Sequence, residues 1–107
     1  MIRKEVLKTD PKGFEIRHAM TREEFNGHGR MFAKVTLAPG QEVSWHTHTD
    51  EIEYYYVLSG NGVFTDSAKK EFNVGEGDVC LMEVNGGHSI RQTGKEPLVF
   101  MALIINL

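Results

Sequence analysis

Hydrophobic and polar residues alternate with a period of two along much of the chain. The clearest case is RMFAKVTL at residues 30–37, where Met31, Ala33, Val35 and Leu37 share one face. Successive side chains of a β-strand point to opposite faces of the sheet. The pattern therefore predicts a strand with one buried face.

Similar short segments recur along the chain, separated by residues that favour turns. We interpret Ser59-Gly60-Asn61-Gly62 as a hairpin turn, because Asn-Gly accepts positive φ at both central positions. About ten short strands at regular spacing favour an all-β sandwich or barrel. Besides 30–37, we expect strands at residues 5–7, 14–16, 42–48, 51–58, 63–66, 71–74, 78–82, 88–93 and 98–107.

A single stretch of the chain favours a helix. Thr21 and Glu24 have the spacing of a capping box, and Met20 and Phe25 have that of a hydrophobic staple. Gly27 suits the end of a helix. We expect one or two helical turns here.

The last predicted strand, LVFMALIINL at residues 98–107, is apolar on both faces. A strand with one face in water should alternate between apolar and polar residues, and this one does not. We expect one face to enter the barrel and the other to form a contact between two copies of the chain. The sequence thus predicts a homodimer, and the alternative is that the N-terminal segment of the same chain covers this strand.

Length and charge narrow the class of protein. The 107 residues predict one domain, with two strands and a short helix in residues 1–29 before a barrel at 30–107. The net charge is −3 and no basic run is present, so neither nucleic acid nor an anionic membrane is an expected partner. The single cysteine, Cys80, allows no intramolecular disulfide. With no leader-like start and no apolar run of about 18 residues, we expect a soluble cytoplasmic protein.

Candidate chemistry gathers in residues 40–60, GQEVSWHTHTDEIEYYYVLSG. His46 and His48 would point to the same face of a strand, and Glu53 lies on the next predicted strand. If these two strands pack antiparallel, the carboxylate meets both imidazoles. Imidazole nitrogens with a carboxylate oxygen bind divalent first-row transition metals. An isolated His-x-His pair is more often a surface feature, but the strand context and the spaced glutamate favour a metal site, with His88 as a fourth candidate ligand.

These residues carry a family resemblance. The spacing of Gly40, His46, His48, Glu53 and Gly60 resembles the first motif of the cupin superfamily.

GDVCLMEVNGGHSIRQ at residues 77–92 resembles the second cupin motif. His88 matches the family histidine, while Glu83, Asn85 and Gln92 stand where the family has proline, glycine and asparagine. Asn tolerates positive φ better than most residues, so Asn85 preserves the turn.

The resemblance implies a small single-domain cupin, which folds as a jelly-roll barrel, also called a double-stranded β-helix. It implies that His46, His48, Glu53 and His88 bind one divalent transition metal ion: Mn, Fe, Ni, Co or Zn. Three nitrogens and one oxygen leave two positions open on a six-coordinate ion, as catalysis requires.

Position along the strand assigns the carboxylate ligand to Glu53 rather than Glu51. A two-residue step moves a side chain by about 6.6 Å, far more than a metal–oxygen bond tolerates. Glu51 and Tyr55 share the face of Glu53 and are candidate catalytic residues. The alternatives are a surface charge at the barrel mouth for Glu51 and core packing for Tyr55. Gln92 is a candidate polar neighbour of the site.

The sequence leaves two classes of function open. The first is a metal-dependent enzyme acting on a small polar, carboxylate or sugar-like substrate, as dioxygenase, decarboxylase, isomerase or lyase. The second is a small-molecule-binding or sensing module without turnover. The four matched ligands argue against a third reading, a metal-free structural cupin.

Overall fold

The computed structural model describes all 107 residues as ten β-strands and one short 3₁₀ helix. The elements are β1 (Val6–Thr9), β2 (Glu15–Met20), η1 (Glu23–Phe25), β3 (Gly29–Leu37), β4 (Glu42–Thr47), β5 (Glu51–Ser59), β6 (Asn61–Thr65), β7 (Glu71–Val74), β8 (Val79–Leu81), β9 (Gly87–Thr93) and β10 (Leu98–Asn106).

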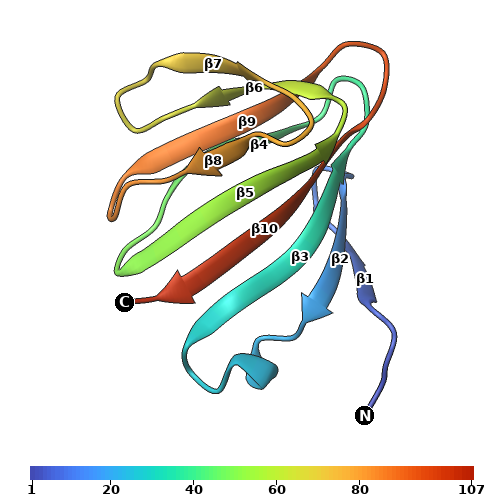
Figure 1. Cartoon of the computed structure of the whole chain (residues 1–107), viewed down its shortest axis with the longest axis vertical. Coiled ribbons are helices and arrows are strands. Elements are labelled where there is room, and N and C mark those ends of the chain that lie inside the picture. Colours follow the sequence, from blue (N-terminus) through green and yellow to red (C-terminus); the bar gives the residue numbers. More distant parts are fainter.

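The strands form two antiparallel sheets that lie against each other (Figure 1). One sheet has six strands in the order β1-β2-β3-β10-β5-β8, and the other has four in the order β4-β9-β6-β7. The predicted all-β jelly roll is confirmed.

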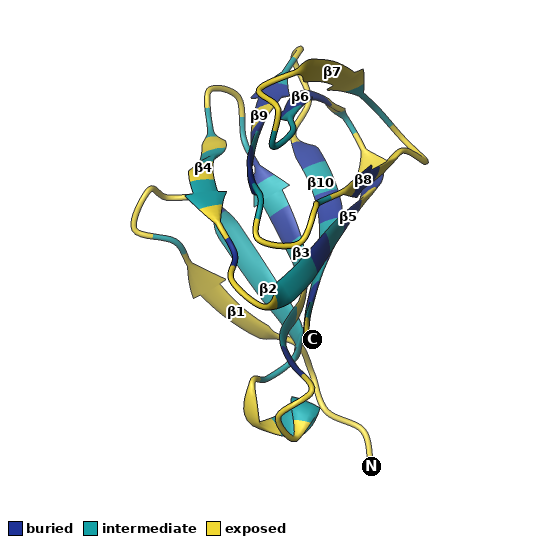
Figure 2. Cartoon of the chain, turned by 90° about the vertical axis from the view of Figure 1, so that its left-hand side faces the viewer, coloured by how far each residue is buried: buried dark blue, intermediate teal, exposed yellow.

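The hydrophobic core fills the space between the two sheets. Along β10, Leu98, Phe100, Ala102 and Ile104 are buried while the residues between them are partly exposed, as Figure 2 shows by colour. Ile90 on β9 packs into the core from the four-stranded sheet. The core thus follows the two-residue period of the sequence.

The N-terminal segment matches its prediction in outline. β1 and β2 pair as a hairpin, with β2 running on to Met20. The expected helix is a single 3₁₀ turn, in which the Thr21 amide donates to Glu24 Oε1 at 2.8 Å. No helix is long and apolar enough to cross a membrane.

The predicted hairpin at residues 59–62 is wrong. β5 and β6 do not pair, because β5 lies between β10 and β8 and β6 lies between β9 and β7. The chain crosses from one sheet to the other at Gly60, where φ is 82°. A Cβ at this position would stand 2.1 Å from the carbonyl oxygen of Pro97, so the crossing point needs glycine rather than an Asn-Gly turn.

The expected pairing of the His46 strand with the Glu53 strand is also wrong. β4 pairs with β9 in the four-stranded sheet, and His46 lies opposite His88. β5 is in the six-stranded sheet, where its pairing with β10 sets Glu53 opposite Ile104. The imidazoles and the carboxylate therefore approach one another from facing sheets.

Candidate metal centre

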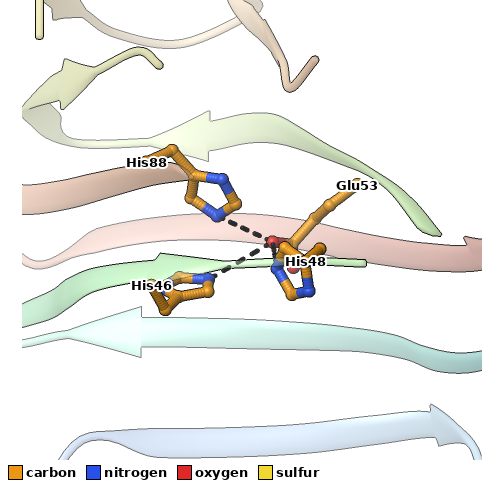
Figure 3. Close-up of side chains that lie close together, drawn as sticks. All are labelled: His46, His48, Glu53 and His88. Carbon is orange, nitrogen blue, oxygen red and sulfur yellow. Dashed lines mark hydrogen bonds and ion pairs between the residues drawn. The ribbon is translucent and has the colours of Figure 1, made fainter. Parts of the chain in front are cut away.

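Four side chains from three strands and a loop converge between the sheets (Figure 3). His46 and His88 are register partners on β4 and β9. His48 lies just beyond the end of β4, where its amide donates to the carbonyl of Gly86 at 3.4 Å. Glu53 reaches across from β5. The structure thus brings together all four residues that the sequence selected.

The carboxylate of Glu53 is the centre of the cluster. Its Oε1 lies 2.8 Å from Nε2 of both His48 and His88, and 3.6 Å from Nε2 of His46. Glu53 is 3% exposed and His88 is fully buried, whereas His46 is partly exposed. The cluster therefore opens to solvent on the His46 side.

Two contacts join the segment around His88 to the segment around His46 and His48. Asn85 adopts φ 61°, as its residue type predicts, and its Oδ1 accepts a hydrogen bond from the Asp50 amide at 2.9 Å. Gly87 packs against Trp45, and a Cβ there would come within 2.5 Å of the indole ring. A larger residue would displace the Trp45 indole from this contact.

The pKa shifts follow from burial and from the hydrogen bonds of the cluster. Burial raises the pKa of Glu53, but hydrogen bonds from His46, His48 and His88 more than offset this and hold it well below its usual value. The pKa of His48 is raised because it donates a hydrogen bond to Glu53. Burial lowers the pKa of His88. The cluster therefore presents an ionised carboxylate with His48 favouring the protonated state.

The four ligand atoms fit a single metal ion. They all lie within 4.8 Å of one another. Atoms bound about 2.1 Å from one ion stand at most about 4.2 Å apart, so small side-chain rotations would complete a coordination shell. Nitrogen and oxygen donors suit Mn, Fe, Ni, Co or Zn without choosing among them.

Glu51 lies behind His48. Its Oε1 is 3.0 Å from Nδ1 of His48, and Arg30 donates to it from Nε at 2.6 Å and from Nη2 at 3.1 Å. These contacts, with Arg30 the larger cause, lower the pKa of Glu51. Sequence reasoning missed Arg30, because no local pattern links the start of β3 to His48, 18 residues later.

Tyr55 lies deeper in the barrel. Its hydroxyl is 3.4 Å from Nε2 of His88, and burial raises its pKa well above the ordinary value, so the hydroxyl stays protonated.

Gln92, the expected polar neighbour, is bonded elsewhere. Its Oε1 accepts from the Gly40 amide at 3.3 Å, and its Nε2 donates to the carbonyls of Gly94 and Glu96. It fastens loops at the far end of its strand and does not contact the histidines.

A cavity of about 220 Å³ opens over the cluster. His46, His48 and Glu53 line it, with Asp10, Arg30 and Tyr55 as further polar groups. Most of the remaining wall is apolar, including Phe14, Val35 and Phe100. The cavity is smaller than the roughly 300–1,000 Å³ of sites for drug-sized ligands, so it suits a small molecule.

Comparison with known families identifies the class of protein. The family described as "Cupin domain" matches residues 33–104, which includes both motif regions. The chain belongs to the cupin family.

Three of the proteins similar to this chain have names that refer to oxalate. An oxalate-binding protein of Thermotoga maritima is 41% identical over 93 residues, 87% of this chain and 76% of that protein. The oxalate decarboxylase OxdC of Bacillus subtilis is 38% identical over 77 residues, 66% of this chain but 20% of that protein. The crystal structure of a predicted oxalate decarboxylase from Thermotoga maritima superposes with a TM-score of 0.87 at 35% identity, covering 100% of this chain and 99% of that one.

Proposed function

We propose that the protein binds one divalent transition metal ion through His46, His48, Glu53 and His88, and uses it to bind and transform a small carboxylate. The observation that carries this proposal is the convergence of three imidazoles on one ionised carboxylate at the wall of a small cavity.

The charge of such a site favours an anion. Three neutral imidazoles and one carboxylate leave a divalent ion with a net charge of about +1, and the charges of Arg30 and Glu51 cancel. Asp10 also lines the cavity, so the positive excess is local to the ion and to Arg30. A carboxylate ligand neutralises that excess. A bound ion would polarise the carboxylate as a Lewis acid.

Arg30 is the protein's own candidate anion contact. It lines the cavity, and Nε and Nη2 hold Glu51 while Nη1 has no hydrogen-bond partner. A guanidinium presents its donors in a planar fork that matches a carboxylate. Arg30 can therefore hold Glu51 and still donate to a ligand.

Oxalate is the first ligand to test, because relatives of this chain are named for binding and for decarboxylating it. Decarboxylation converts hydrogen oxalate to formate and carbon dioxide, and the carbon that keeps its carboxylate must gain a proton. Tyr55 lines the cavity with a protonated hydroxyl and is the candidate group to hold that proton. Glu51 would act on His48 rather than on the substrate.

A second candidate function is binding without turnover. Glu51 is engaged by Arg30, and the raised pKa of Tyr55 makes it a weak acid. The cavity thus lacks a general base with a pKa near neutrality among its proposed catalytic residues, which favours capture over chemistry.

One experiment separates the two functions. The metal-free protein is loaded with Mn, Fe, Ni, Co or Zn, and oxalate, sugar phosphates and longer dicarboxylates are titrated by calorimetry while formate is assayed in parallel. Binding with formate release supports the enzyme, and binding alone supports the capture module. Absence of metal binding, or of carboxylate binding by every metal form, would reject the proposal.

A matched variant tests the role of Arg30. Arg30→Gln should weaken oxalate binding about 10- to 100-fold, because one charge-assisted hydrogen bond contributes about 1.5–3 kcal/mol. Oxamide, the uncharged diamide, serves as the control ligand, and its affinity should fall less, because it has no charge for Arg30 to pair with.

A further inference from the structure

A second pocket, of about 390 Å³, adjoins the metal cavity, which is the cavity over His46, His48 and Glu53. It lies at the edge of the six-stranded sheet that β1 and β2 form (Figure 1). Arg30 and Met31 line both spaces, so the pocket and the metal cavity share a wall. The rest of the pocket is lined by Val6, Lys8, His18, Thr21, Arg22 and Glu23.

The register of the strands places Lys8 beside the metal cavity. Lys8 lies opposite Ile16 in the pairing of β1 with β2, and Ile16 lines the metal cavity. Side chains directly opposite each other in an antiparallel pair have Cβ atoms about 4.5–5.5 Å apart. His18, two residues further along β2, lies opposite Ala33, which is fully buried. Lys8 and His18 therefore share the inner face of the sheet, which is the face that carries the core.

The charged residues of the pocket are mostly cationic. Lys8, Arg22 and Arg30 line it, and Glu23 is the one acidic residue among its lining residues. Arg30 is paired with Glu51, so an excess of about one positive charge remains at the pocket. The chain as a whole has a net charge of −3, so this local excess has the opposite sign. The pocket therefore attracts an anion.

Lys8 and Arg22 are free to bind a ligand. Neither side chain takes part in a hydrogen bond or an ion pair, whereas the nearby Arg3 and Arg17 are both paired with glutamates. Burial, and then the charge of Lys8, lower the pKa of His18. His18 is therefore mostly uncharged at neutral pH, and it can donate one ring hydrogen to a ligand without adding charge.

We propose that this pocket binds a phosphate group through Lys8 and Arg22, and that it holds the far end of a phosphorylated ligand whose carboxylate lies in the metal cavity. A phosphate group carries up to two negative charges and three terminal oxygens, so it can accept hydrogen bonds from both cations together. A carboxylate has one charge and is matched by a single guanidinium. The phosphate site does not rest on the proposed function, but its use by a ligand of the metal cavity does.

The first test titrates inorganic phosphate into the metal-free protein at constant ionic strength. The backbone amide signals of Thr21, Arg22 and Glu23 should shift and reach saturation, and those of His46 and His88 should stay in place. Acetate is the control anion and should give no saturable shift. Shifts of equal size with acetate and phosphate, or no saturation with phosphate, would overturn the phosphate site.

Charge variants test which side chains hold the phosphate. Lys8→Gln and Arg22→Gln should each weaken phosphate binding about tenfold, because each removes one charge-assisted hydrogen bond. Glu23→Gln should strengthen binding, because it removes the negative charge of the pocket. Lys95→Gln removes a positive charge from an exposed turn outside the pocket and should leave the affinity unchanged. Equal losses in Lys8→Gln and Lys95→Gln would mean that phosphate responds only to net charge, which would overturn the site.

The second test asks whether one ligand occupies both spaces. In the metal-loaded protein, 2-phosphoglycolate and the longer 3-phosphoglycerate are compared with glycolate and glycerate. At least one phosphorylated acid should bind about 10- to 100-fold more tightly than its parent acid. Lys8→Gln should remove most of this advantage and leave the affinity for the parent acid unchanged. An advantage that is absent, or that survives in Lys8→Gln and Arg22→Gln, would show that the pocket does not hold the far end of the ligand.

The outcomes separate this proposal from the proposed function. If the metal-free protein binds phosphate at residues 21–23 but no metal form binds a carboxylate, the proposed function fails and the phosphate site stands. If a metal form binds oxalate but phosphate gives no saturable shift at these residues, the phosphate site fails and the proposed function stands.

Discussion

The ligand candidates differ most in how firmly the protein holds them. Glu53 lies at the centre of the cluster, 2.8 Å from two histidines and 3.6 Å from the third, whereas Glu51 contacts only His48 and is held by Arg30. The two glutamates lie two residues apart on β5, so their different surroundings come from depth in the barrel.

This difference predicts unequal effects on metal binding. Glu53→Ala should reduce metal affinity by more than about 100-fold, because it removes a direct ligand, and Glu51→Ala by roughly 10- to 100-fold at most. Titration of metal into both variants measures this. Retained binding in Glu53→Ala together with loss in Glu51→Ala would reverse the assignment.

Protons and metal compete for the same imidazole nitrogens. The pKa of His48 is raised above the ordinary histidine value of about 6.5 in the metal-free protein. At pH 6.5 more than half of His48 is therefore protonated. Metal affinity should therefore fall as pH drops through this range, by up to about tenfold per unit for each proton displaced.

The lowered pKa of Glu53 keeps that carboxylate ionised throughout, so the loss comes from the histidines. Competition with a chelator between about pH 7.5 and 5 checks the slope. An affinity that does not change over this interval would show that the histidines are not the ligands.

Among the elements, the crossing from β5 to β6 takes the chain from the six-stranded sheet to the four-stranded sheet. Gly60 combines a positive φ with a backbone neighbour, and Gly77 has a similar φ of 85° with no atom within 4 Å of a Cβ. The pair separates the two reasons for glycine at a turn.

Gly60→Ala should destabilise the protein by about 3 kcal/mol or more, since strain adds to a clash with the Pro97 carbonyl. Gly77→Ala should cost only the strain, about 1–2 kcal/mol. Chemical denaturation of both variants tests this, and equal losses would mean that the approach to Pro97 is not limiting.

At the scale of the whole molecule, the outer face of the six-stranded sheet is mostly apolar, with Lys34 as the charged residue in its two central rows. Register partners form two rows across β3, β10, β5 and β8: Phe32, Leu103, Tyr54 and Leu81, then Lys34, Met101, Tyr56 and Val79. Leu81 is 62% exposed and Tyr56 53%. The alternative that the N-terminal segment covers this face is wrong, because β1 and β2 extend the edge of the same sheet.

We expect a second copy of the chain to cover this face. Light scattering at tens of micromolar should give the mass of a dimer, and Leu103→Glu should give a monomer by placing a charge in the middle of the apolar rows. Lys95→Glu, in an exposed turn outside the rows, should remain dimeric. If the unaltered protein is a monomer at this concentration, the prediction of a dimer is wrong.

The sequence by itself determined the strands and the residues of the candidate site, because both depend on local order. A two-residue period gave the strand from 30 to 37 and the two faces of β10, and the spacing of His46, His48, Glu53 and His88 selected the cluster. Each signal is contained within a few neighbouring positions or within a family motif.

Only the tertiary structure decided which strands are neighbours. It paired the strand of His46 with the strand of His88 rather than with that of Glu53, took the chain from one sheet to the other at Gly60, and brought Arg30 to Glu51. These relations join residues far apart in the sequence, and they follow from how two sheets bury their apolar faces together. No local pattern of residues encodes that choice, since many pairings of the same strands would satisfy the same alternation.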